Sequence, residues 1–145
     1  MSPETNRSIA RRFFAEQDRL RGGPAAELCA PGYAAHLAGM PPLDLAGHQA
    51  FAAAFYAAFP DLRHQVELVA AEDDRAAVRF TLFGTHTGPF MDMAPTGRPI
   101  VLSALAFMRV EGERVAELWG EFNQLGLMSQ LTSDPAPAVE RAGGI

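Results

Sequence analysis

The sequence predicts a single α+β domain in which helices come first and a curved, mostly antiparallel sheet follows. Apolar residues recur every three to four positions in most of the segment before residue 60, and every second position from about residue 66 onward. The first spacing is typical of helices with one buried face, and the second is typical of strands. Because helices and strands are grouped rather than alternating, an α+β fold is favoured over a βαβ arrangement. A length of 145 residues fits one domain.

The first helix is predicted from Pro3 to about Arg21. Ser2 is a suitable N-cap, and proline is well tolerated in the first turn because its missing N–H would have no helical partner there. Gly22 and Gly23 end this helix, and a second, short helix is predicted over residues 24–29.

A turn at 31–32 and a short strand over 33–37 are expected next, followed by a loop over 39–44. The second long helix is predicted from Leu45 to Phe59, with Asp44 as its N-cap. Much of one side of this helix carries aromatic residues at helical spacing, namely Phe51, Phe55, Tyr56 and Phe59.

Four strands follow, separated by a polar turn at 72–74, a special loop at 84–98 and a hairpin turn at 111–114. Their alternating segments are 65–70, 78–83, 100–108 and 115–123. Both alternating sets are rich in apolar residues, so we expect both faces of the sheet to be covered, one by helices and the other by a partner subunit. A helical turn over 126–131 completes a domain of residues 1–131, and 132–145 is predicted to be a flexible tail.

Composition excludes several classes of protein. The net charge is −5 with no basic stripe, which argues against a nucleic-acid partner. The single cysteine, Cys29, cannot form an intrachain disulfide and is expected to be a buried thiol. The sequence has no apolar run long enough for a membrane span, and its polar N-terminus lacks a signal-peptide core. A cytoplasmic location and no membrane partner are the resulting expectations.

Four segments together resemble the SnoaL-like polyketide cyclases of the NTF2-like superfamily, including their polyketide hydroxylase branch. The most informative is Gly84-Thr85-His86-Thr87-Gly88-Pro89-Phe90 with the following turn Ala94-Pro95-Thr96-Gly97-Arg98. The others are Tyr33-Ala34-Ala35-His36 with its proline loop, Ala58-Phe59-Pro60-Asp61-Leu62, and the ending 115–131 around Glu117-Leu118-Trp119. Each segment alone is weak evidence, but their order and spacing are specific for the family.

The resemblance implies a cone-shaped α+β barrel, with a curved sheet wrapped around helices and an apolar pocket open at one end. It also implies an enzyme without metal or coenzyme that acts on aromatic polyketide intermediates in antibiotic biosynthesis. Cyclases of the family close a ring by intramolecular aldol condensation, with an aspartate as acid/base. In this sequence Asn123 stands at that position. An amide can donate a hydrogen bond to an oxygen but cannot transfer a proton near neutral pH.

His36, Glu121 and Asn123 are therefore the predicted catalytic residues. His36 is a suitable base at neutral pH. Glu121 replaces the missing aspartate if its strand face lines the cavity, because partial burial would raise its pKa; the alternative is a solvent-facing carboxylate. Asn123 is expected to stabilise an enolate oxygen.

The predicted substrate-binding residues supply apolar surface or a polar group that can form a hydrogen bond. The alternative for His86 is a structural role, in which it holds the loop over 88–98 in place. The alternative for the aromatic residues and methionines is packing in the hydrophobic core. No metal site is predicted, because His36 and His86 lack a third ligand at suitable spacing. The set is Tyr33, Phe51, Phe55, His86, Met91, Met108 and Trp119.

Three functions remain open from the sequence. The first is a cofactor-independent cyclase acting on a small aromatic polyketide. The second is a polyketide hydroxylase with a possible reductase partner, which Asn123 favours somewhat. The third is a non-catalytic NTF2-like ligand-binding module. A homodimer or higher homo-oligomer is expected in each case.

Overall fold

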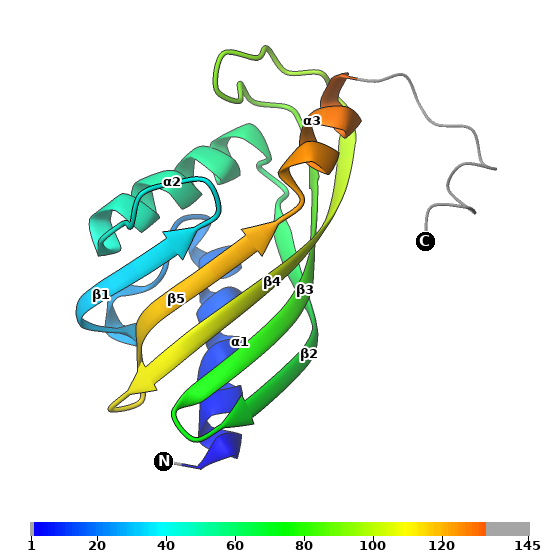
Figure 1. The fold of residues 1–145 in the computed structure, drawn as a ribbon. Coiled ribbons are helices and arrows are strands. Elements are labelled where there is room, and N and C mark those ends of the chain that lie inside the picture. Colours follow the sequence, from blue (N-terminus) through cyan, green and yellow to red (C-terminus); the bar gives the residue numbers. More distant parts are fainter. Residues whose placement is uncertain (1, 133–145) are drawn as a thin grey trace.

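The computed structural model describes residues 2–132 and shows three α-helices and five strands (Figure 1). The predicted tail over 132–145 lies outside the described residues, except for Thr132. None of the helices within 2–132 combines the length and apolar character that crossing a membrane requires. The elements are α1 (Pro3–Leu20), the short 3₁₀ helix η1 (Ala26–Leu28), β1 (Cys29–Leu37), α2 (Leu45–Ala58), β2 (Arg63–Glu72), β3 (Arg75–Thr85), β4 (Pro99–Glu111), β5 (Arg114–Phe122) and α3 (Gln124–Thr132).

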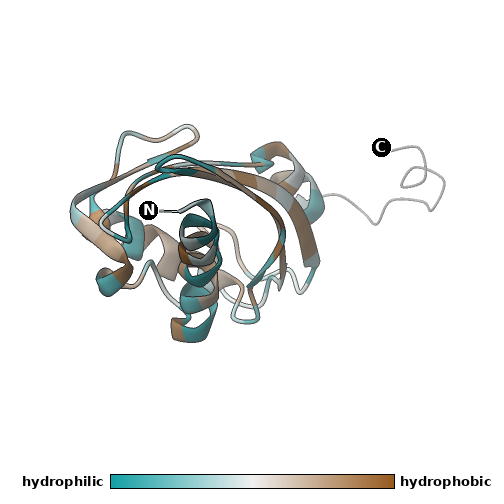
Figure 2. Cartoon of the chain, turned by 90° about the horizontal axis from the view of Figure 1, so that it is seen from below, coloured by the Kyte–Doolittle hydropathy of each residue, from teal (hydrophilic) through white to brown (hydrophobic). Residues whose placement is uncertain are grey.

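The five strands form one sheet in the order β1-β5-β4-β3-β2. Only β1 and β5 run parallel; the other neighbours are antiparallel. The sheet curves strongly but stays open, with β1 and β2 as its edges (Figure 2). The predicted α+β class and the cone-like, mostly antiparallel sheet are confirmed, and the barrel is an unclosed one.

Helix α1 lies inside the curve of the sheet (Figure 2). The Ser2 hydroxyl accepts a hydrogen bond from the Thr5 backbone N–H, so the predicted N-cap is confirmed. One face of α1 is buried and packs against β2 and β3. We call the sheet face that meets α1 the inner face and the opposite one the outer face. On β4, the inner face carries the buried set Ile100, Leu102, Ala104, Ala106 and Met108.

Two details around β1 differ from the sequence prediction. The short helix ends at Leu28, and Cys29 already begins the strand. Residues 31–32 do not form a turn; they lie in a bulge of β1, where the pairing with β5 shifts register between Cys29 and Ala34. Gly32 has φ +79° there, a conformation that glycine adopts without strain. The backbone therefore bends without leaving the sheet, which local sequence signals do not distinguish from a turn.

Helix α2 is fixed at both ends. Its N-cap is Asp44, whose carboxylate accepts the Gly47 N–H at 2.8 Å, as predicted. Near the same end, the segment after α1 passes so close that a Cβ on Gly23 would lie 2.2 Å from the Cα of Gln49. At the other end, the Ala58 carbonyl accepts hydrogen bonds from the backbone N–H groups of Thr87 and Gly88. These contacts hold α2 against the segment after α1 at one end and against the loop over 86–98 at the other.

We expect Gly23→Ala to lower the free energy of unfolding by about 1–3 kcal/mol, because the added methyl group must push α2 away. Gly22→Ala is the matched control, since its Cβ would meet nothing closer than 3.9 Å. That change should stay within about 0.5 kcal/mol of the wild type. Urea unfolding of both variants measures the difference, and equal costs at the two positions would contradict this packing.

Candidate active site

An apolar cavity of about 100 Å³ lies between the inner face of the sheet, α1 and α2. Phe51 and Phe55, two of the predicted substrate-binding residues, border it. Their contact with substrate stays a prediction. The polar side chains on its wall are few: Gln17, His48, Tyr56 and His64, with Glu121 at the border. The main apolar lining residues are Phe13, Phe14, Leu37, Phe51, Phe55, Phe80, Leu82, Leu118 and Phe122.

His64 is held on the cavity wall by Asp18 of α1. The Nδ1 atom of His64 lies 2.8 Å from Oδ1 of Asp18, and the His64 backbone N–H donates to Oδ2, also at 2.8 Å. The Tyr56 hydroxyl donates to the same carboxylate at 2.6 Å. Phe14 and Phe80 flank the imidazole at ring distances of 5.2 and 5.3 Å. The ring is therefore fixed by both hydrogen bonds and packing.

The Asp18 carboxylate is ionised at neutral pH. Burial raises its pKa, but the hydrogen bonds from His64 and Tyr56 outweigh burial and hold the pKa below the usual value. The pKa of Tyr56 is raised, by burial first and by the neighbouring carboxylate, so Tyr56 keeps its proton. Asp18 thus carries a negative charge directly behind the His64 ring.

His48 is the second imidazole on the wall. Its Nδ1 atom is 2.8 Å from the buried hydroxyl of Tyr33, and the two rings stack with centroids 5.9 Å apart. Burial, followed by the charge of nearby His64, lowers the pKa of His48 to about 4. The ring is therefore neutral at pH 7. Tyr33, predicted as a polar contact to substrate, lies against His48 and supports it. Its contact with substrate stays a prediction.

We expect the free energy of unfolding to fall by about 3 kcal/mol as the pH drops from 6.5 to 4. His48 has an ordinary pKa of 6.5 and a lowered value of about 4 in the folded protein. Between these values the unfolded chain binds a proton that the folded chain does not, so acid favours unfolding. Asp18 contributes only below about pH 4, because its folded pKa lies beneath the usual 3.8.

Urea unfolding at several pH values measures this effect. His48→Gln should remove most of the slope, whereas His36→Gln, on the outer face, should keep it. An unchanged slope in His48→Gln would contradict the assignment of the pKa to that ring.

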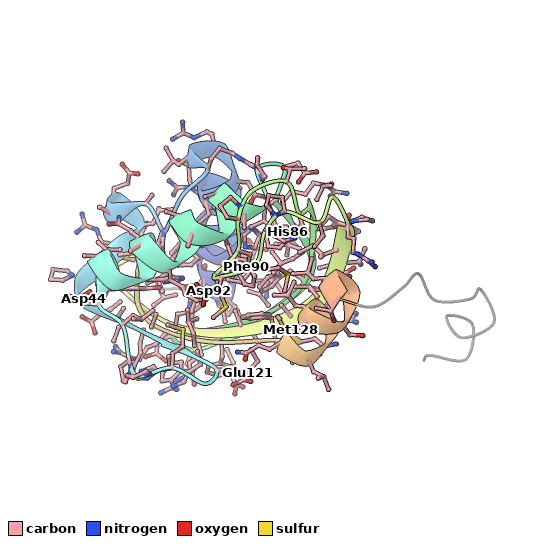
Figure 3. The ribbon with its side chains drawn as sticks, turned by 90° about the horizontal axis from the view of Figure 1, so that it is seen from above. Asp44, His86, Phe90, Asp92, Glu121 and Met128 are labelled. Carbon is pink, nitrogen blue, oxygen red and sulfur yellow. The ribbon has the colours of Figure 1, made fainter. Side chains whose placement is uncertain are left out.

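Two of the predicted site residues, His36 and Trp119, lie away from this cavity, and a third, Glu121, lies only at its border. On β5, Trp119 and Glu121 pair with Phe107 and Leu105 of β4, whose side chains are 42% and 57% exposed on the outer face. His36 pairs with Trp119 and stacks on it with ring centroids 5.3 Å apart. Figure 3 shows Glu121 on the side of the sheet opposite to α2. The side chain of Glu121 is exposed, which fits the alternative of a solvent-facing carboxylate. A catalytic role for His36 or Glu121 stays a prediction.

The outer face holds its own polar cluster. Nε2 of His36 is 2.6 Å from Oε2 of Glu117, and Arg109 binds the other oxygen of Glu117 at 3.4 Å. These hydrogen bonds, the one from His36 most, lower the pKa of Glu117. Exposed apolar side chains lie on the same face of β4 as Arg109, and they are Val101, Leu105 and Phe107. Such a face fits the expected partner subunit, which stays a prediction.

His86 ties down the loop over 86–98, as the structural alternative anticipated. Its ring is fully buried beneath that loop and lies 5.4 Å from the Phe59 ring. Nδ1 accepts the Thr96 backbone N–H at 3.2 Å, and the His86 N–H donates to the Arg98 carbonyl. Figure 3 places His86 and Phe90 on the α2 side of the sheet. Any contact of His86 with substrate stays a prediction.

Three further predicted site residues do not border the cavity: Asn123, Met91 and Met108. The side-chain oxygen of Asn123 accepts the Gly126 N–H at 2.8 Å and so caps α3. Met91 is 84% exposed in the loop, and Met108 is fully buried opposite Leu118 in the sheet. Neither methionine borders the cavity. Among residues 2–132, no group of three potential ligands is placed to hold a metal ion.

Sequence reasoning did not select His48 or His64 as site residues. His48 shares a helical face with Phe51 and Phe55, and His64 has the same strand parity as Val66. These spacings were the available signals. The partner of His64 is 46 positions away in α1, so only the folded chain brings the pair together.

A curved open sheet around an inner helix, with an apolar cavity and a few polar groups, defines an NTF2-like α+β cone. The family model described as SnoaL-like polyketide cyclase matches residues 8–131. The chain therefore belongs to the SnoaL-like polyketide cyclase family.

Solved structures resemble this chain over nearly its whole length. The chain is similar to AclR, a putative hydroxylase from Streptomyces galilaeus, with 25% identity, a TM-score of 0.83 and coverage of 99% of this chain and 91% of that one. For IdmH, a putative polyketide cyclase from Streptomyces antibioticus, the identity is 28%, the TM-score 0.71 and the coverage 90% and 97%. A putative SnoaL-like polyketide cyclase from Jannaschia sp. CCS1 has 23% identity, a TM-score of 0.80 and coverage of 92% and 95%. No curated protein matches the sequence.

Proposed function

We propose that this chain is an enzyme that binds an apolar polyketide in the cavity and closes a ring by intramolecular aldol condensation. In this reaction only side chains of the protein accept and donate protons. A base removes a proton from a carbon next to a carbonyl group, and the resulting enolate carbon bonds to a second carbonyl carbon of the same molecule. The alkoxide formed there takes the proton back, so the reaction needs no oxidant or reductant.

One observation carries this proposal: an apolar cavity whose wall presents an imidazole held by a half-buried carboxylate, His64 with Asp18. An imidazole exchanges protons near neutral pH, and a carboxylate behind it stabilises the charged form. Membership of the family and the polyketide cyclases among the similar structures supply the substrate class. The acid/base group proposed here, His64, therefore differs from the residues that the sequence predicted.

The size of the cavity limits how the substrate fits. Drug-sized ligands occupy sites of about 300–1,000 Å³, which is more than the cavity's volume of about 100 Å³. Phe51 and Phe122 border the cavity and are only half-buried. We therefore propose that these two rings turn aside when a multi-ring substrate binds.

A hydroxylase is the second candidate, because Asn123 occupies the position of the family aspartate and caps α3 instead of offering a carboxylate. The similarity to AclR, described as a putative hydroxylase, supports the same candidate. In that reaction the enolate would react with oxygen, and a reductase partner would supply the electron pair.

Incubation of the purified protein with an aromatic polyketide β-keto ester distinguishes these functions. A cyclase forms the ring-closed product equally fast in air and under nitrogen. A hydroxylase is inactive under nitrogen and consumes oxygen with reductant in air. Recovery of bound but unaltered ester under all conditions would contradict both and favour the non-catalytic binding module.

A further inference from the structure

The hydrogen bonds behind His64 determine which of its ring nitrogens carries the proton. An ionised carboxylate only accepts hydrogen bonds, so Asp18 requires a proton on Nδ1 of His64. In the neutral ring, Nε2 then has a free lone pair. Within residues 2–132, no protein group bonds to this nitrogen. His64 thus faces the cavity as a proton acceptor.

His48 has the opposite arrangement. The Tyr33 hydroxyl has no other acceptor among the described residues, so it donates to Nδ1 of His48. The reverse bond, from Nδ1 to the hydroxyl oxygen, would leave the buried hydroxyl hydrogen without a partner, at a cost of about 1–3 kcal/mol. With Nδ1 accepting, the neutral ring carries its proton on Nε2. His48 thus offers the cavity an N–H donor.

The two imidazoles lie near each other on the wall of one cavity. Both line the same space, and the charge of His64 is one of the causes that lower the pKa of His48. When His64 takes up a proton, His48 is the ring that stays neutral, because burial already disfavours its charge. One ring can therefore gain a proton while the other keeps its donor.

We propose that the two histidines act in opposite senses on one substrate: Nε2 of His64 removes the proton, and the N–H at Nε2 of His48 binds the carbonyl oxygen that becomes the enolate. This assignment rests on the proposed acid/base function and gives it residues. The electrons of the broken C–H bond form the C=C bond of the enolate, and negative charge collects on the oxygen. Asp18 stabilises the imidazolium form of His64, and a neutral donor stabilises the oxygen without having to release its proton.

Asp18 and Tyr33 are positioning residues in this scheme, because each acts through the imidazole it contacts. Tyr56 donates to Asp18 and holds the carboxylate in place from α2. The scheme also explains why polar groups are buried behind each ring in an otherwise apolar wall. Each fixes one of the two tautomers that a neutral imidazole can adopt.

Nitrogen-15 NMR of histidine-labelled wild-type protein at pH 7 tests the assignment directly, with His48→Gln and His64→Gln used only to identify the signals. We expect neutral His48 to carry its proton on Nε2 and neutral His64 to carry its proton on Nδ1. A proton on Nδ1 of His48, or on Nε2 alone of His64, would overturn the proposal whatever the substrate is. The protonation states are read from the wild-type protein, and the two variants serve only to assign its signals.

A binding experiment tests the donor with 2-naphthol, whose oxygen stands for the enolate, and with naphthalene, which lacks it. The ratio of the two affinities should fall about tenfold in His48→Phe, the effect of one lost hydrogen bond. The matched control His36→Phe on the outer face should leave the ratio unchanged. An unchanged ratio in His48→Phe would also overturn the proposal. If the tautomers and the ratio are as expected but no polyketide is converted, the proposed function fails and the assignment of the two rings stands.

Discussion

Replacing His64 with glutamine is expected to lower kcat by about 10²–10⁴-fold, the usual contribution of a general base. Glutamine keeps a polar side chain against Asp18, so the cavity and the fold should survive. It cannot accept a proton from carbon at neutral pH. Because substrate binding depends mainly on the apolar wall, KM should change little. Steady-state kinetics with the polyketide ester, after a check of folding by circular dichroism, measures the loss.

The same substitution at His36 tests whether the active site lies in the cavity or on the outer face. His36 is one of the two acid/base residues that the sequence predicts, but its ring contacts Glu117 and Trp119 on the outer face. If the cavity is the site, His36→Gln should retain most of the activity that His64→Gln loses. Loss of activity in His36→Gln alone would contradict the cavity and restore the original prediction. Gln65→Ala, exposed and close to His64 in β2, controls for general effects of changing that strand.

The arrangement of helices and strands could be predicted because local rules agree with the fold along most of the chain. The caps at Ser2 and Asp44 and the turn at 111–114 each follow from residues that are neighbours in sequence. The alternation in β3 and β4 also matches the observed burial. Predictions failed at Cys29 and at 31–32, where a bulge inside a parallel pair takes the place of a turn. Pairing between distant strands decides that detail, and the local sequence carries no sign of it.

The site was harder to predict than the fold for a specific physical reason. Strand parity correctly places Glu117, Trp119 and Glu121 on one face, but parity does not say which face is concave. In β4, apolar residues such as Leu105 and Phe107 occupy the outer face as well, so hydrophobicity does not distinguish the two. The position of α1 settles the question, and that position is a property of the whole chain.

Phe59→Ala is expected to be the most destabilising single change, with a loss of about 3–5 kcal/mol. The Phe59 ring is fully buried and contacts the rings of Phe55, His86 and Phe90. Removing it leaves a void between α2 and the loop over 86–98, and the surrounding rings cannot all move in to fill it. Thermal unfolding should show a decrease in Tm of roughly 10 °C or more for a domain of this size. Hydrogen exchange should show faster exchange of the His86 N–H, whose bond to Arg98 depends on this packing.

Phe107→Ala on the outer face is the matched control, because the same ring is removed from a side chain that is 42% exposed. In a monomer its cost should stay near about 1 kcal/mol, since less area is buried and no cavity is created. A cost as large as that of Phe59→Ala, decreasing on dilution, would mean that a second subunit covers the outer face, as the predicted homodimer requires. A small cost for Phe59→Ala itself would instead contradict the tight packing beneath the loop. The pair of variants therefore tests the inner and outer faces of one sheet with the same chemical change.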